Sequence, residues 1–135
     1  MKLSPNFSLA ELTRTSYPRL QDSPPVEVVC SLVFLCATAL QPLRDFLGEP
    51  VSISSGYRSA ALNAKVGGVP GSFHRRGLAA DIVVSSEDDA RRKFEFLRQL
   101  PYVDSVLFEH RGRSSWIHVQ VSFHPRHIAN FNFLG

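Results

Sequence analysis

Residues 72–84 read Ser72-Phe73-His74-Arg75-Arg76-Gly77-Leu78-Ala79-Ala80-Asp81-Ile82-Val83-Val84 and pass from a polar loop into an apolar strand. The loop spans residues 67–77 and contains four glycines, whereas residues 80–84 form an almost continuous apolar run. Only Asp81 interrupts that run. Burying a carboxylate is costly unless it is paired or bound to a metal. The segment therefore predicts a buried strand that carries a polar site near its start.

Apolar periodicity and capping residues predict the elements on both sides of this segment. Ser8 and Glu11 form a capping box at the start of a short helix. Pro42 is expected to kink or restart a long helix, because proline has no amide donor. We expect helices opening at residue 8 and covering about 25–47, 59–66 and 86–100, and strands at 51–54, 80–84, 106–109 and 116–122, the last two joined by a polar hairpin loop over 110–115.

These elements add up to an α+β fold with a small, mainly antiparallel sheet and flanking helices. The 135 residues match the usual size of one domain, so we expect a single domain over residues 1–135. Leucine, isoleucine, valine and phenylalanine make up about 31% of the chain, which excludes a disordered protein.

The charge and the apolar stretches narrow the choice of partners. The formal net charge is +3, and the lysines and arginines are scattered, so we expect a solvated basic surface and no specific nucleic-acid partner. The longest strongly apolar stretch, residues 28–40, is shorter than the roughly 20 residues that span a bilayer, so no membrane span is expected. Residues 1–6 show no apolar signal region, which favours a protein that is cytoplasmic when made.

Cys30 and Cys36 lie six residues apart in the long predicted helix. A helix rises about 1.5 Å per residue, so the two are about 9 Å apart along its axis. A disulfide requires Cα atoms within about 7 Å. We therefore expect two free, buried cysteines, as suits a reducing compartment.

The candidate site consists of His74, Asp81 and His118. His118 lies among large apolar residues in the predicted strand at 116–122, where an imidazole needs a partner. A single histidine in such a strand is more often a hydrogen-bonded core residue than a metal ligand. Together, two histidines and a carboxylate match the three protein ligands of a catalytic zinc, which leave a fourth position for water. The spacing alone does not decide between these interpretations.

Three motifs around these residues favour a metal site. They are Ser55-Gly56-Tyr57-Arg58-Ser59, the pattern S-x-H-x-x-G-x-A-x-D over residues 72–81, and Trp116-Ile117-His118. Their order and distances over residues 6–123 resemble the zinc D-Ala-D-Ala carboxypeptidase family of metallopeptidases, in particular its small single-domain members in phages and bacteria. The resemblance implies the fold shared by hedgehog domains and DD-peptidases.

The same resemblance assigns roles to individual residues. It implies that Zn²⁺ binds to His74, Asp81 and His118. Arg58 matches a family arginine that binds the substrate carboxylate or stabilises the oxyanion; the alternative is a structural salt bridge. Ser72 is expected to contact substrate or to fix its own loop. Trp116 is expected either to line the substrate cleft or to pack as a core aromatic.

At the positions of the catalytic base the chain departs from the family pattern. Members carry a glutamate three residues before the last histidine, or a histidine two residues before it; these positions are Ser115 and Trp116 in this chain. Glu109, at the end of the predicted strand 106–109, is the remaining candidate. The alternative is a solvated strand-end residue paired with Arg111 or Arg113.

The expected function is that of a monomeric zinc metallopeptidase that hydrolyses peptide bonds of peptidoglycan stem peptides or cross-links. The resemblance does not separate a D,D-carboxypeptidase from an endopeptidase. Since no signal is visible, such a protein would reach the cell wall after release, as a phage-encoded lysin does. Two alternatives stay open: a catalytically inert zinc-binding module of the cell wall or virion, and a basic assembly module that contacts nucleic acid.

Overall fold

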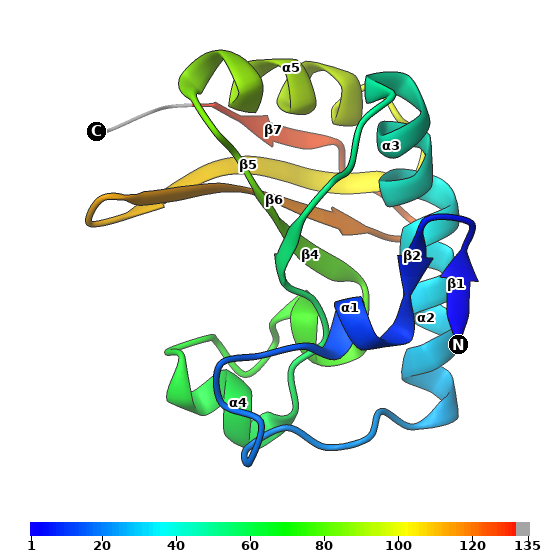
Figure 1. Cartoon of the computed structure of the whole chain (residues 1–135), viewed down its shortest axis with the longest axis vertical. Helices are drawn as coiled ribbons and strands as arrows, with labels where there is room; N and C mark the ends of the chain where they lie inside the picture. The colour runs from blue at the N-terminus through cyan, green and yellow to red at the C-terminus, as the bar shows by residue number, and fades with distance from the viewer. Residues whose placement is uncertain (132–135) are drawn as a thin grey trace.

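A five-stranded sheet forms the centre of the computed structural model, which describes residues 1–131 (Figure 1). Neighbouring strands are antiparallel except for the last pair, which is parallel. This confirms an α+β fold with a mainly antiparallel sheet; the last four residues of the expected domain lie outside the described part. In spatial order the strands are β3 (Ile53–Ser55), β4 (Ala79–Val83), β6 (Ser114–Val121), β5 (Val103–Arg111) and β7 (Ile128–Asn130).

Helix α5 (Glu87–Leu97) packs against β5 and β6, and the long helix that contains α2 (Val26–Leu35) and α3 (Gln41–Leu47) lies at one side of the sheet (Figure 1). Three features were not predicted: β7, a short antiparallel pair at the N-terminus, and a 3-10 turn in the glycine-rich loop. The remaining elements are β1 (Lys2–Ser4), β2 (Phe7–Ser8), α1 (Leu9–Thr13), α2 (Val26–Leu35), the π-helical turn η1 (Cys36–Leu40), α3 (Gln41–Leu47), α4 (Ala60–Lys65), the 3-10 turn η2 (Phe73–Arg76) and α5 (Glu87–Leu97).

The long helix runs without a gap through α2, η1 and α3, as expected for residues 25–47. The π-helical turn lies immediately before Pro42, which sits in the first turn of α3. In this irregular turn the backbone hydrogen bonds of the helix shift to accommodate Pro42, which has no amide donor. Gly48, with φ at 68°, adopts the left-handed conformation that ends the helix.

The same helix bears on two expectations: the absence of a membrane span stays a prediction, and the burial of both cysteines is corrected. Val26–Leu47 is long and apolar enough to cross a membrane by length and composition, whereas the prediction counted only residues 28–40. Leu32 and Leu35 are fully buried in the core, as in the core helix of a globular domain. Cys36 is buried as predicted, but Cys30 is exposed because it lies on the outward side of α2; both are free.

The two faces of the sheet have different chemistry. Cα partners on neighbouring antiparallel strands point to the same face. Ile82 on β4 pairs with Ile117 on β6, which in turn pairs with Phe108 on β5, and this apolar face packs against α5. The opposite face carries Asp81 and its partner His118. The sheet therefore separates the hydrophobic core from the polar site.

The hairpin between β5 and β6 is tighter than predicted. The strands continue to Arg111 and Ser114, so the loop consists of residues 112–113 rather than 110–115. Gly112, with φ at 60°, allows this tight turn. Glu109 consequently lies within a strand, opposite Trp116, and not at a strand end.

Candidate metal centre

Asp81 and His118 face each other across the β4–β6 pair. Their Cα atoms are register partners, and His118 Nδ1 lies 3.1 Å from Asp81 Oδ1. Both residues are buried. The carboxylate that the sequence places in an apolar run therefore has its partner on the neighbouring strand.

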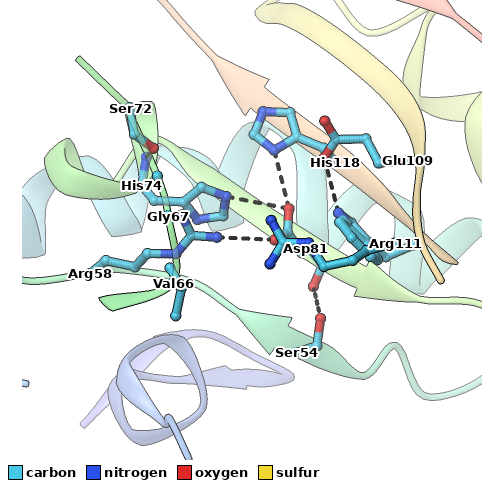
Figure 2. A pocket seen from close by; sticks show the side chains of 12 residues that line it. Ser54, Arg58, Val66, Gly67, Ser72, His74, Asp81, Glu109, Arg111 and His118 are labelled. Atoms are coloured by element: carbon cyan, nitrogen blue, oxygen red, sulfur yellow. Dashed lines mark hydrogen bonds and ion pairs between the residues drawn. The ribbon is translucent and has the colours of Figure 1, made fainter. Parts of the chain in front are cut away.

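His74 reaches the same carboxylate from η2. Ser72 caps this turn by accepting a hydrogen bond from the His74 backbone N–H, and Gly77, with φ at 72°, ends it. The His74 ring then lies with Nε2 3.3 Å from Asp81 Oδ1. Figure 2 shows both imidazoles pointing toward Asp81. Three side chains from a turn and two strands thus converge on one point.

Gly56 fixes the orientation of the His74 ring. Its carbonyl oxygen lies 2.8 Å from His74 Nδ1. A carbonyl only accepts, so Nδ1 carries a proton, and in the neutral ring Nε2 presents its lone pair toward Asp81. A side chain at position 56 would collide with the backbone of Leu12 in α1. This contact explains why the motif has glycine before Tyr57.

The three donors fit a zinc ion. His118 Nε2 lies 2.7 Å from Gln120 Oε1, which leaves Nδ1 to offer its lone pair. One ligand atom from each of His74, Asp81 and His118 lies within 4.8 Å of the others. Ligands about 2.0–2.1 Å from a tetrahedral zinc lie about 3.3 Å from one another. The two distances to Asp81 Oδ1, 3.3 and 3.1 Å, agree with that spacing.

The protonation of Asp81 also suits a ligand. In the metal-free protein, burial raises the pKa of its carboxyl group, but hydrogen bonds from His118 and His74, when these rings carry a proton on the nitrogen that faces Asp81, outweigh burial and hold the pKa well below its usual range. A bound zinc ion would take the place of those protons. Asp81 is therefore a carboxylate at neutral pH, which is the form that binds a metal.

Arg58 lies beside this centre and is held from several sides. Its Nη2 is 3.4 Å from Asp81 Oδ2, its Nε donates to Ser55 Oγ at 3.1 Å, and its Nη1 donates to Asn63 Oδ1 at 3.3 Å. The ion pair between Arg58 and Asp81 agrees with the alternative interpretation, in which Arg58 forms a structural salt bridge. A side chain at Gly68 would collide with Asn63, so that glycine keeps room for the arginine and its partner.

Glu109 and Trp116 form a second pair in the same cleft. Trp116 Nε1 donates to Glu109 Oε1 at 2.9 Å. Trp116 thus holds the carboxylate of Glu109. The sequence analysis considered only Arg111 and Arg113 as partners of Glu109 and did not predict this one. Both side chains are partly buried and border the cleft.

A cleft of about 400 Å³ brings the candidate residues together. Every side chain that the sequence singled out borders it, from the three candidate ligands to the four others, Arg58, Ser72, Glu109 and Trp116. Arg111 also borders it and was considered only as a partner of Glu109. Sequence reasoning missed Gln120, although its position two residues after His118 on one strand places both on the same face.

A histidine–carboxylate–histidine set at an open cleft is typical of zinc-dependent hydrolases. The Peptidase M15 family model matches residues 5–120, and the chain therefore belongs to the peptidase M15 family. The family resemblance predicted from the motifs is confirmed. Over 83 residues, 61% of this chain, the sequence is 30% identical to the zinc D-Ala-D-Ala carboxypeptidase of Streptomyces albus G. The matched region is 32% of that relative, so this chain spans about a third of its length.

Proposed function

We propose that this chain is a zinc-dependent peptidase that hydrolyses peptide bonds in peptidoglycan stem peptides or cross-links. The convergence of three ligand atoms within 4.8 Å at a cleft carries this proposal. Membership of the peptidase M15 family and the name of the Streptomyces relative support the reaction and the substrate class. The proposal includes a hedgehog/DD-peptidase-like fold and one zinc peptidase-like domain over residues 1–135.

His74 Nε2, Asp81 Oδ1 and His118 Nδ1 would hold Zn²⁺ in this proposal. When bound, zinc supplies Lewis acidity and lowers the pKa of a coordinated water to about 7. The protein contributes a buried carboxylate and two imidazoles whose outward nitrogens are already committed to Gly56 and Gln120. The donor atoms are therefore oriented before any ion arrives.

Glu109 is proposed as the general base. A carboxylate at the edge of the cleft can take a proton from the attacking water and return it to the leaving amine. Trp116 holds Oε1 through its indole N–H, which fixes the carboxylate relative to β6. Trp116 and Ser72 also border the cleft, and we assign them to substrate contact.

Arg58 is proposed to act on the substrate. Its guanidinium group offers several N–H donors in a fixed plane, which suits a substrate carboxylate or a developing oxyanion. Ser55 and Asn63 hold Nε and Nη1, so the group is oriented at the cleft without substrate. This orientation reduces the entropy lost when substrate binds.

A digest of purified peptidoglycan by the zinc-loaded protein tests the proposal. Mass spectrometry should find new peptide termini, and these name the bond that is cut. Glu109→Gln should lower the rate by about 100-fold or more, since general bases contribute about 10²–10⁴-fold. Glu95→Gln, a change on the exposed side of α5, is the matched control and should cut like the unchanged protein. Absence of cleavage by the zinc-loaded protein would contradict the proposal, whereas equal cleavage by Glu109→Gln would remove only Glu109.

An inert zinc-binding module is the second candidate. The observation that favours it is the family departure at Ser115 and Trp116, where members carry an acid or a histidine. Such a module would bind zinc and sediment with insoluble peptidoglycan without releasing any peptide. A peptidase would instead release peptides during the same sedimentation assay.

We also propose that the protein acts as a monomeric lysin that reaches the wall after release from the cell. The resemblance to small phage-encoded members supports this role. Expression inside bacteria should then lyse them only when a membrane-permeabilising partner is produced as well. Lysis without that partner, or no lysis with it, would contradict a released lysin.

A further inference from the structure

Gln120 contacts the candidate ligand His118 on the side that faces away from Asp81. The two residues lie two positions apart on β6, so their side chains share one face of the sheet. His118 Nε2 and Gln120 Oε1 are 2.7 Å apart. An amide oxygen only accepts, so this contact requires a proton on Nε2, and the neutral, metal-binding form of the ring then has its lone pair on Nδ1.

Asp104 fixes which end of the Gln120 amide faces the histidine. Gln120 Nε2 donates to Asp104 Oδ2 at 2.9 Å. A carboxylate accepts and does not donate, so the amide nitrogen must face Asp104 and the amide oxygen must face His118. The choice of histidine tautomer therefore depends on a residue of the next strand.

A bulge in β5 brings Asp104 to this position. Val103 pairs with Val121 and Ser105 pairs with Gln120, so Asp104 is the extra residue on β5. Bulges turn a side chain out of the regular alternation of a strand. The Asp104 side chain is only 2% exposed, and an unpaired carboxylate at that depth would be costly.

Arg126 compensates the buried charge of Asp104. Its backbone N–H and its Nε donate to Oδ1 at 2.9 and 3.0 Å, and its Nη2 donates to Oδ2 at 2.7 Å. Arg126 is 58% exposed, so the contacts run from the molecular surface to the candidate metal centre. We define Arg126, Asp104 and Gln120 as the His118 relay.

We propose that the His118 relay is a positioning device for the metal ligand, with Gln120 setting the tautomer and the ring orientation of His118 and thereby the affinity for zinc. This inference rests on the zinc site proposed above. Partners of this kind hold the ring in place and increase the basicity of the ligating nitrogen. Their loss commonly costs about 10–100-fold in metal affinity.

Competition with a chromophoric chelator measures the zinc affinity of the full chain and tests the relay. Gln120→Met keeps the length of the side chain and removes the acceptor, so it should weaken zinc binding by about 10–100-fold. Gln41→Met is the matched control, because Gln41 is also buried and hydrogen-bonded to Ser4 and Asp45 in a different network. It should leave the zinc affinity unchanged even if it lowers stability.

A double exchange, Gln120→Glu with Asp104→Asn, restores the acceptor. The new carboxylate accepts from His118 Nε2–H, and the net charge stays the same. The new amide at position 104 donates to that carboxylate through the nitrogen that replaces Oδ2, so the hydrogen bond from Arg126 Nη2 is lost, whereas Oδ1 still accepts from Arg126 Nε and the Arg126 backbone N–H. Zinc should bind this variant at least as tightly as the unchanged protein. The zinc-loaded form should also keep a slowly exchanging His118 Nε2–H resonance in NMR spectra, which Gln120→Met should lose.

The outcomes separate this inference from the proposed function. If the unchanged protein does not bind zinc, the proposed function fails. If it binds zinc and Gln120→Met binds equally well, the relay alone is overturned. The relay is also overturned if the double exchange binds zinc at least about tenfold more weakly than the unchanged protein. This second variant keeps the test decisive even if Gln120→Met does not fold.

Discussion

Asp81 on β4 and His118 on β6 are register partners whose side chains meet at 3.1 Å, and this pairing aligns a carboxylate and an imidazole across two neighbouring strands. The alignment follows from backbone hydrogen bonds between the strands, so it does not depend on a flexible loop. Two of the three candidate ligands are therefore placed by the sheet itself, and only His74 comes from a turn.

The first prediction concerns ligand removal. His74→Ala, Asp81→Ala and His118→Ala should each lose most of the bound zinc, because each removes one of three protein ligands. Zinc content after dialysis, measured by elemental analysis, checks this. His124→Ala removes an exposed histidine outside the cleft and should retain the metal. A full complement of zinc in any of the first three variants would remove that residue from the ligand set.

The second prediction concerns Gly56. Gly56→Ala should lower the free energy of unfolding by about 1–3 kcal/mol, since its Cβ would collide with the Leu12 backbone. It should also weaken zinc binding, because the Gly56 carbonyl orients His74. Chemical denaturation and a zinc titration measure the two effects. Gly71→Ala is the control, as a Cβ there meets nothing within 4 Å. Equal stability of both variants would refute the close approach.

The third prediction concerns Arg58. Arg58→Lys keeps the charge but loses the planar set of donors. We expect kcat/KM on peptidoglycan peptides to fall by roughly 10²-fold, the scale for losing one oxyanion donor, while zinc stays bound. Arg98→Lys, on the exposed end of α5, is the control. Unchanged kinetics in Arg58→Lys would instead favour a purely structural ion pair with Asp81.

The fourth prediction concerns pH and Asp104. Hydrogen bonds from Arg126 are the main reason that the pKa of Asp104 falls to about 2, against an ordinary value of 3.8. The native pKa is lower than the unfolded one, so the pairing stabilises the fold above about pH 4 and this stabilisation is lost as the pH falls toward 2. Asp104→Asn should be less stable than the unchanged protein at pH 7, by about 1–3 kcal/mol. Urea denaturation of the metal-free protein should show the difference shrinking between pH 4 and pH 2. A difference that stays constant over that range would contradict the assignment.

The fifth prediction concerns the cysteines. Burial, with a smaller contribution from Glu11, raises the pKa of the Cys36 thiol to about 12, so that thiol stays protonated and inaccessible. Cys30 is exposed. A thiol reagent at pH 8 should label one cysteine in the native protein and both after denaturation. Rapid labelling of Cys36 in the native state would show that the core around η1 opens readily.

Much of the site could be predicted because its residues lie in short motifs beside clear elements. Asp81 stood out as a carboxylate in an apolar strand, and His118 as an imidazole in another. The motifs also indicated the family to which the chain belongs. The proximity of Asp81 and His118 could not be derived from their spacing in the sequence, because it depends on the strand register that pairs these two residues.

Other features depend on tertiary contacts that leave little trace in the sequence. The length of the β5–β6 hairpin was misjudged, since the polar residues 110–115 continue the strands instead of forming a loop. The partner of Glu109 follows from that tighter hairpin. Gln120 lies on the face of His118, but its link to Asp104 requires a bulge, and the link to Arg126 requires the chain to return beside β5.

The central claim is that His74 Nε2, Asp81 Oδ1 and His118 Nδ1 bind one zinc ion. A crystal of the zinc-loaded protein, measured on both sides of the zinc absorption edge, tests it most directly. We predict one strong anomalous peak at about 2.0–2.2 Å from each of these three atoms. A map without a peak between them, or a zinc bound through His118 Nε2 instead, would contradict the account.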